Sequence, residues 1–351
     1  HERERVALAF RKRLAQRRRA MQQRGVDLRV PRELGELQPR EGEGLRLRAE
    51  HAGLWEELVS LGVVAEQSAA WTRAVSALLD VESLPEVPVP DGLHATLRPY
   101  QELGFRWLRF LGNARLGGIL ADDMGLGKTM QALALASSLK EGGELDRPML
   151  VVAPTSVLGT WEAEAAKFAP GLDVRVLAQT SKKRTEPLAD IVAGADLVVT
   201  SYTLLRLDEE EYVGLPWSVA LLDEAQFVKN RQSRGYQSVR KLRARTKFAI
   251  TGTPLENNLM DLWSLLSIVA PGLFADPVAF AERYRRPIEN GSDPAALGRL
   301  HRRVRPLMLR RTKETVASEL PPKQEQVLSV ELSPAHRRLY DKQLAAERKQ
   351  V

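Results

Sequence analysis

The chain has 351 residues, of which 44% are hydrophobic and 28% charged, enough for one large or two modest domains. The formal net charge of +7 is compatible with a polyanionic partner. The absence of cysteine excludes disulfides and thiolate zinc sites, and the five scattered histidines lack metal-ligand spacing, so we expect no structural metal. No apolar run reaches membrane-spanning length and no secretory signal opens the chain. We therefore expect no membrane partner and a cytoplasmic location.

Residues 1–84 are predicted to form an accessory N-terminal region, and residues 85–96 a proline-rich linker. Apolar side chains recur at helical spacing in the arginine-rich stretch over residues 1–24, which predicts a basic helix. This helix could contact nucleic acid or present a solvated face. Pro85, Pro88 and Pro90 exclude a helix interior and mark the domain boundary. Because the chain begins at His1 within a charged segment and ends in a helical run, we expect a fragment of a longer protein.

From residue 97 onward, short apolar runs alternate with helical stretches. This alternation predicts an α/β lobe with a mostly parallel sheet covered by helices on both faces. Ligands of such sheets collect at the carboxyl ends of the strands, and the polar motifs described below fall there. The predicted strands are residues 118–121, 149–153, 174–177, 197–201, 219–223 and 248–251.

A glycine-rich turn follows the first of these strands and precedes a predicted helix over residues 130–140. Strand, turn and helix in this order are typical of a phosphate-binding loop, in which free N–H groups face the anion. In such a loop Lys128 would lie on the β- and γ-phosphates and the Thr129 hydroxyl would bind Mg²⁺. Asp122 occupies the first glycine position of the strict pattern, and the alternative is an ordinary glycine-rich turn. The residues expected around the nucleotide are Asp123, Met124, Gly125, Leu126, Gly127, Lys128 and Thr129.

Two carboxylates, Asp223 and Glu224, leave the buried strand over residues 219–222. Adjacent acids at such a place are unfavourable unless a cation or a proton transfer uses them. We expect Asp223 to hold Mg²⁺ and Glu224 to orient and deprotonate an attacking water. A third strand ends in a turn that contains Thr251 and Thr253, whose hydroxyls could connect the nucleotide site to a neighbouring surface.

Together, these segments resemble the Swi/Snf-like ATPases of helicase superfamily two, in which aspartate at the first glycine position is usual. The resemblance covers roughly residues 93–345, and the arginine- and alanine-rich composition favours a bacterial source. Further matches occur in order along the chain, at residues 97–101, 153–156 with Trp161 after them, 199–202, 309–313 and 319–323.

The resemblance implies a DNA-stimulated ATPase that uses ATP and Mg²⁺ to move along double-stranded DNA without separating the strands. It implies that residues 97–335 form the first of two RecA-like lobes, with a helical protrusion in residues 272–320, and that residues 336–351 begin the connection to a second lobe. The implied roles are adenine recognition by Gln101 with Arg98 beside it, nucleotide contact by Gln226, DNA-backbone contact by Pro154, Thr155, Thr200 and Ser201, and coupling of nucleotide state to lobe movement by Thr251 and Thr253.

Several interpretations stay open. In the family, a second lobe supplies the arginine fingers of hydrolysis, so we expect this chain to bind nucleotide but to hydrolyse it slowly. The basic residues between 299 and 313 could face DNA or solvent. One alternative function is a strand-separating helicase. Another is a nucleotide-gated module that binds DNA or RNA polymerase, and RNA polymerase or another DNA-bound protein is a candidate partner beside duplex DNA. A bacterial source would place the protein at the nucleoid.

Overall fold

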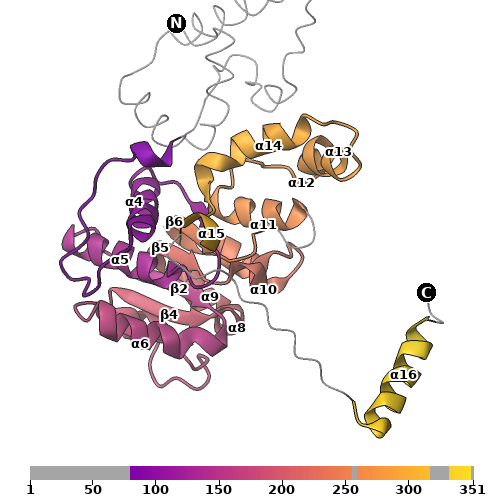
Figure 1. Cartoon of the computed structure of the whole chain (residues 1–351). Helices are drawn as coiled ribbons and strands as arrows, with labels where there is room; N and C mark the ends of the chain where they lie inside the picture. Colours follow the sequence, from indigo (N-terminus) through magenta and orange to yellow (C-terminus); the bar gives the residue numbers. More distant parts are fainter. Residues whose placement is uncertain (1–79, 255–258, 317–331, 349–351) are drawn as a thin grey trace, which may run out of the picture. The chain divides into compact units, whose positions relative to one another are not determined.

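The computed structural model describes residues 80–254, 259–316 and 332–348 (Figure 1). The predicted accessory region up to residue 79 and the segment 319–323 lie outside the described residues. The chain divides into two units, His1–Val316 and Ala317–Val351. In the second unit, the described element is helix α16 (Pro334–Arg348). All elements discussed below belong to the first unit.

A seven-stranded sheet forms the centre of the first unit, in the order β3-β4-β2-β5-β6-β1-β7, and all its strand pairs are parallel. The predicted α/β fold with a largely parallel sheet is confirmed. The strands are β1 (Gly118–Leu120), β2 (Met149–Ala153), β3 (Val174–Val176), β4 (Leu197–Ser201), β5 (Pro216–Leu222), β6 (Arg243–Ile250) and β7 (Met308–Leu309).

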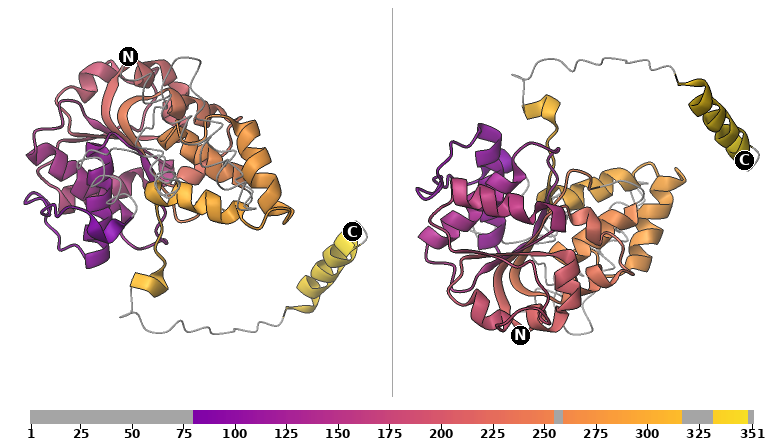
Figure 2. Two further views of the ribbon diagram at one scale, coloured as in Figure 1. Left: turned by 90° about the horizontal axis from the view of Figure 1, so that it is seen from above. Right: turned by 90° about the horizontal axis from the view of Figure 1, so that it is seen from below.

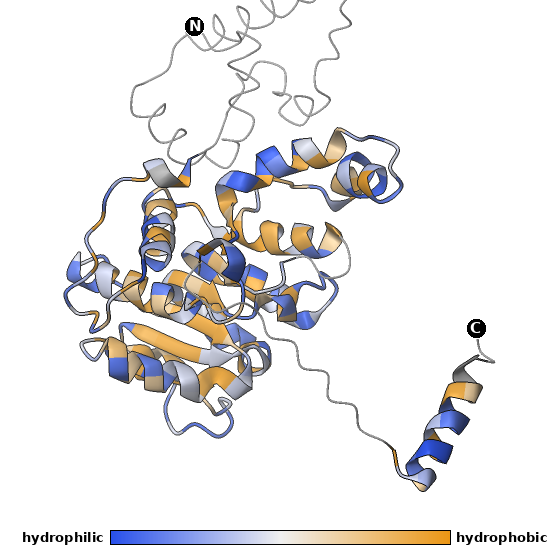
Figure 3. Ribbon diagram, in the orientation of Figure 1, coloured by the Kyte–Doolittle hydropathy of each residue, from blue (hydrophilic) through white to orange (hydrophobic). Residues whose placement is uncertain are grey.

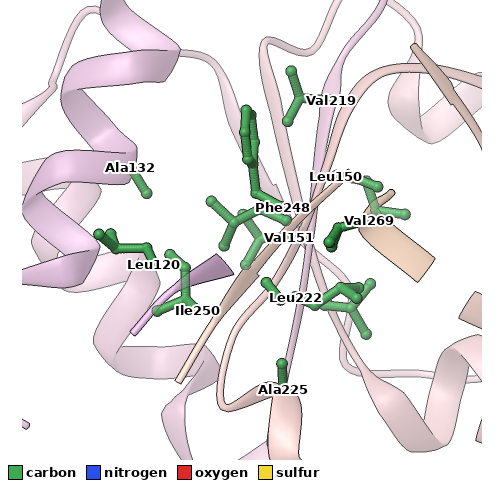
Figure 4. Packing of buried hydrophobic residues seen from close by; sticks show 14 of the residues in the cluster. Leu120, Ala132, Leu150, Val151, Val219, Leu222, Ala225, Phe248, Ile250 and Val269 are labelled. Atoms are coloured by element: carbon green, nitrogen blue, oxygen red, sulfur yellow. The ribbon is translucent and has the colours of Figure 1, made fainter. Parts of the chain in front are cut away.

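The central strands are apolar on both faces, so helices must cover both. Every residue of β2 and β4 is buried. In Figure 4, Phe248 and Val151 lie between Ala132 of one covering helix and Val269 of another. The hydropathy colouring in Figure 3 concentrates hydrophobic residues in the strands. This core therefore fixes the sheet edge at which the polar motifs end.

The helices α4 (Pro99–Asn113), α5 (Lys128–Glu141) and α6 (Leu158–Phe168) pack in a row on one side of the sheet. Helices α8 (Tyr202–Leu207), α10 (Arg234–Lys241) and α11 (Leu259–Val269) pack on the other side (Figure 2). The helix predicted from residue 130 begins two residues earlier, at Lys128. The shorter elements are η3 (Val81–Ser83), η4 (Thr155–Val157), α7 (Leu188–Val192), α9 (Glu209–Gly214) and η5 (Ala225–Val228).

Beyond α11 the chain forms a mainly helical segment, as predicted, and then returns to the sheet as β7. Its core is a cluster of Phe274, Phe280 and Tyr284, with ring centroids 5.0–5.4 Å apart. The buried Arg303 guanidinium lies 4.5 Å from the Phe274 ring and donates to the Tyr284 hydroxyl at 3.0 Å. The elements are α12 (Pro277–Phe280), the π-helix η6 (Ala281–Arg285), α13 (Arg286–Glu289), α14 (Ala296–Val304), η7 (Arg305–Leu307) and, after β7, α15 (Lys313–Val316).

The basic residues between 299 and 313 do not share one surface. Arg303 and Arg311 are buried, and Arg299 forms an ion pair with Asp293 at 2.7 Å. Because both side chains are buried, Arg303 and Arg311 face neither DNA nor solvent, and the two open interpretations apply only to the exposed basic residues of this stretch. The predicted domain limits stay a prediction, although Leu93 of the proline-rich segment is buried in the core. Within residues 80–254, 259–316 and 332–348, no helix is long and apolar enough to cross a bilayer.

Candidate nucleotide site

The glycine-rich turn between β1 and α5 has the backbone of a phosphate-binding loop. Gly125 and Gly127 have φ values of 84° and 73°, in the left-handed region that favours glycine. A Cβ atom at Gly127 would lie 2.3 Å from Nε2 of Gln101, so any residue other than glycine at this position would force the Gln101 side chain to move. The first N–H groups of α5 follow Gly127 directly, which places them where an anion binds best.

Lys128 is the first residue of α5, and its side chain is buried beneath the loop. Its Nζ donates to the carbonyl oxygens of Asp122 at 2.7 Å and Asp123 at 3.1 Å. Burial lowers the pKa of Lys128, and the neighbouring carboxylates, with Glu224 first, oppose this shift. The charges of Glu224 and Asp223 therefore act on the Lys128 ammonium group.

Asp223 follows the last residue of β5, at the carboxyl edge of the sheet. Its Oδ2 accepts from Nε1 of Trp161 at 2.8 Å, and its Oδ1 accepts from the Glu224 N–H at 3.0 Å. Burial raises the pKa of Asp223, the Trp161 bond lowers it, and the Glu224 charge raises it. The Tyr202 hydroxyl donates to the Asp223 carbonyl at 2.8 Å. The carboxylate is therefore held from two sides.

Glu224 is connected to the third motif by a chain of hydrogen bonds. Gln226 Nε2 donates to Glu224 Oε2 at 2.8 Å, and Gln226 Oε1 accepts from the Thr251 hydroxyl at 2.8 Å. The Thr251 oxygen in turn accepts from the Thr253 N–H at 3.1 Å. The Glu224 backbone lies in the left-handed region at φ 47°, an unfavourable conformation for a residue with a Cβ atom. Both ends of the Gln226 amide are thus engaged within the lobe.

Gln101 lies against the loop from the first turn of α4. Its Nε2 donates to the Leu126 carbonyl at 3.3 Å, and its Oε1 accepts from the Arg98 N–H at 2.9 Å. The sequence prediction placed Gln101 and Arg98 at the adenine end of the site. The structure brings Gln101 to the loop, and adenine recognition stays a prediction.

The family follows from comparison with known proteins. A model of the SNF2-related domain matches residues 100–351.

The chain belongs to the SNF2-related domain family.

The SNF2-related sequence has relatives among bacteria, fungi and archaea. It is 39% identical over 282 residues to YwqA, a candidate ATP-dependent helicase/translocase of Bacillus subtilis. This alignment covers 80% of this chain and 31% of YwqA. It is 36% identical over 288 residues to the TATA-binding protein-associated factor MOT1 of Saccharomyces cerevisiae, covering 76% of this chain and 15% of MOT1. The chain thus spans less than a third of these relatives.

A solved structure, the Sulfolobus solfataricus SWI2/SNF2 ATPase core in complex with double-stranded DNA, is similar in fold as well as in sequence. The TM-score is 0.61 at 36% identity, over 76% of this chain and 56% of that chain. The fold of the SNF2-related lobe and the resemblance to Swi/Snf-like ATPases are therefore confirmed.

The four residues predicted to contact DNA lie at the carboxyl ends of the adjacent strands β2 and β4. Thr155 is exposed and Pro154 half-buried. The Thr200 hydroxyl is buried and bonded to the Tyr212 hydroxyl at 2.7 Å, and the Ser201 hydroxyl accepts from Leu204 N–H at 3.1 Å as the cap of α8. In this conformation the Thr200 and Ser201 hydroxyls serve the lobe itself, and their contact with DNA stays a prediction.

Sequence reasoning missed two contacts of the SNF2-related site. The Trp161–Asp223 bond joins α6 to the acidic motif, and Arg311 forms an ion pair with the buried Asp122 of the loop. The sequence identifies Trp161 and the segment 309–313 only as matches to the family. No spacing rule gives their partners, because the fold alone brings them together.

Proposed function

We propose that this SNF2-related chain binds Mg-ATP and duplex DNA as the first lobe of an ATP-dependent DNA translocase. The observation that carries the proposal is the meeting of Lys128 with Asp223 and Glu224 at one sheet edge. These residues lie far apart in the sequence, and their charges act on one another in the fold. A structural lysine would not need two acids and a glycine-rich loop around it.

The residues fit Mg-ATP in number and kind. The loop N–H groups and Lys128 would hold the phosphates, and Thr129 with Asp223 would hold Mg²⁺ together with phosphate oxygens. Among the described residues, no group of three or more acidic, histidine or cysteine side chains could hold a metal ion. The bound ion would neutralise charge on the phosphates, while Glu224 would orient a water and take its proton.

Coupling between nucleotide and lobe movement would use the hydrogen-bond chain from Glu224 through Gln226 to Thr251 and Thr253. A change at Glu224 when the γ-phosphate leaves would reach Thr251 through a single amide. Both ends of that amide are hydrogen-bonded, so a displacement of Glu224 would be passed on to Thr251. We assign Gln226 to this coupling together with its predicted place at the nucleotide.

Duplex DNA is proposed as the partner because a similar archaeal core was solved with double-stranded DNA. Exposed Thr155 and the strand-end backbone of β2 would contact phosphate oxygens, which position the duplex without reading its sequence. The net charge of +7 supports such a polyanion. Work on DNA is consistent with a cytoplasmic, nucleoid-associated location. RNA polymerase as a further partner stays a prediction.

The test is a titration of the chain with a fluorescent ATP analogue in Mg²⁺, for the native sequence, Lys128→Ala and Lys140→Ala. Lys140 lies at the other end of the same helix and pairs with Asp196, so it controls for loss of a lysine from α5. We expect binding to need Lys128 and to tolerate loss of Lys140. Equal binding by both variants and the native chain would contradict the proposal.

Turnover of ATP with and without duplex DNA is measured in parallel, with Glu224→Gln as the second variant. We expect the chain to hydrolyse slowly, because the arginine fingers of the resemblance belong to a second lobe and are worth about 10³- to 10⁵-fold in rate. We expect Glu224→Gln to bind nucleotide as the native chain does. Rapid DNA-stimulated turnover by these 351 residues would contradict the need for a second lobe.

A further inference from the structure

A buried ion pair lies directly beneath the start of the phosphate loop. Asp122 is fully buried, and the Arg311 side chain is 9% exposed. Arg311 binds the carboxylate through two nitrogens, with Nε 2.9 Å from Oδ1 and Nη2 bonded to Oδ2. This is the bidentate geometry that makes arginine–carboxylate pairs strong and directional.

Three further groups complete the surroundings of Arg311. Its Nη2 donates to Gln131 Oε1 at 3.1 Å, its Nη1 donates to the Tyr100 carbonyl, and the Tyr100 ring lies 5.6 Å from the guanidinium carbon. Space for the cluster depends on Gly104, where a Cβ atom would lie 1.8 Å from Gln131 Oε1 and 2.7 Å from Arg311 Nη2. A buried arginine is tolerated only when it is paired and hydrogen-bonded in this way.

The backbone on both sides of Asp122 is joined to the segment that carries Arg311. The Ala121 N–H donates to the Leu309 carbonyl at 2.7 Å, and the Asp123 N–H donates to the Arg311 carbonyl at 3.0 Å. The Asp122 and Asp123 carbonyls are also the two acceptors of Lys128 Nζ. The part of the loop that receives the lysine is therefore shaped by the Arg311 segment.

We propose that Arg311 is a positioning residue of the nucleotide site, which holds the phosphate loop in its binding shape through Asp122. The proposal rests on the proposed Mg-ATP function. The Arg311 guanidinium is enclosed by Asp122, Gln131 and Tyr100, so it would act on a bound nucleotide through the loop and not by direct contact. This ion pair explains how an aspartate can occupy a position where phosphate-binding loops have glycine, because the Asp122 carboxylate points inward and pairs with Arg311.

The test compares the nucleotide affinity of the 351-residue chain with those of Arg311→Met, Arg311→Lys and Asp122→Asn. We expect Arg311→Met and Asp122→Asn to weaken binding of the fluorescent ATP analogue roughly 10- to 100-fold, the range for residues that orient a binding group. Arg311→Lys keeps the charge but loses the two-pronged geometry, so we expect an intermediate loss. The double variant Asp122→Asn/Arg311→Met leaves no unpaired charge, so its loss should be smaller than the sum of the single losses.

The matched control is Arg303→Met. Arg303 is buried to a similar degree, bonds to Tyr284 and lies over an aromatic ring, but it belongs to the helical segment and not to the loop. We expect it to lower the melting temperature without changing nucleotide affinity. Only variants that still melt cooperatively are titrated. If Arg311→Met fails to fold, Asp122→Asn, which keeps the size of the side chain, tests the positioning role in its place.

The outcomes separate this inference from the proposed function. Folded Arg311 and Asp122 variants that bind nucleotide within two-fold of the native chain would overturn the positioning role, while a Lys128 requirement in the same assay would leave Mg-ATP binding intact. Equal losses in Arg303→Met and Arg311→Met would also overturn it, because general destabilisation would then suffice. Loss of binding in the native chain itself would overturn both proposals.

Discussion

Replacing Trp161 by phenylalanine removes one hydrogen bond from Asp223 and keeps an aromatic ring in the core. Trp161 is 1% exposed, and its Nε1 lies 2.8 Å from Asp223 Oδ2. A hydrogen bond to a charged group contributes about 1.5–3 kcal/mol, which corresponds to roughly 10- to 150-fold in a binding constant. Mg²⁺ itself attracts the carboxylate, so we expect an effect at the lower end of this range. Half-maximal nucleotide binding by Trp161→Phe should need about ten-fold more Mg²⁺.

The effect should also depend on pH in a defined direction. The Trp161 bond lowers the pKa of Asp223 against the rise caused by burial, so its loss raises that pKa further. A protonated carboxylate cannot bind Mg²⁺, and the deficit of Trp161→Phe should therefore grow as the pH is lowered.

The assay is nucleotide binding against Mg²⁺ concentration at two pH values, with Trp217→Phe as the control. Trp217 is equally buried and donates its Nε1 to the Tyr212 carbonyl at 2.9 Å, away from Asp223. We expect similar losses of stability in both variants and a Mg²⁺ effect in Trp161→Phe alone. An unchanged Mg²⁺ requirement in folded Trp161→Phe would refute the assignment of Trp161 to Asp223.

Three further predictions concern coupling, packing and pH. In a translocation-competent form, Gln226→Met should reduce the DNA stimulation of ATP turnover more strongly than it reduces nucleotide affinity, because it breaks the bonds to Glu224 and Thr251; retained stimulation would contradict the coupling chain. Gly104→Ala should destabilise the lobe by about 1–3 kcal/mol in denaturant unfolding, since its methyl group would meet Gln131; unchanged stability would mean that the cluster can shift. Burial lowers the pKa of Lys247 to about 8 from 10.5, so the unfolded chain binds more protons between these values and native stability should rise with pH there. Lys247→Met should flatten this rise in melting temperatures at pH 7.5 and 9.5, and an unaltered slope would exclude Lys247 as its source.

The strands that the sequence predicted best are those that are apolar throughout. Both β2 and β4 have the predicted limits, because continuous apolar runs mark strands buried on both faces. The prediction began β5 and β6 too late. The start of β5 is interrupted by Pro216 and the polar Ser218, and the start of β6, from Arg243, is polar and partly exposed. β7 has two residues, too few for any periodic pattern.

The candidate site was predictable where its chemistry is local in sequence. The loop before α5 is recognisable from its glycines after a predicted strand, and the acids after β5 are recognisable as two adjacent carboxylates at a strand end. The partners of those groups were not predictable, because Asp122 meets Arg311, and Asp223 meets Trp161, only where the fold brings distant segments together. Sequence alone could therefore name the reacting groups but not the contacts that hold them.

The strand order also has a consequence for how this lobe forms during synthesis. Among the described strands, β1 pairs with β6 and β7, the last two to leave the ribosome. The glycine-rich loop after β1 is therefore made early, but β1 gains its first sheet neighbour, β6, only after translation passes Ile250, and its second, β7, only after Leu309. At about 5–20 residues per second this delay lasts on the order of ten seconds or more. Contacts of such sequence separation also form slowly. Until then β1 lacks the strands that bury it, so the glycine-rich loop takes its final shape late in synthesis.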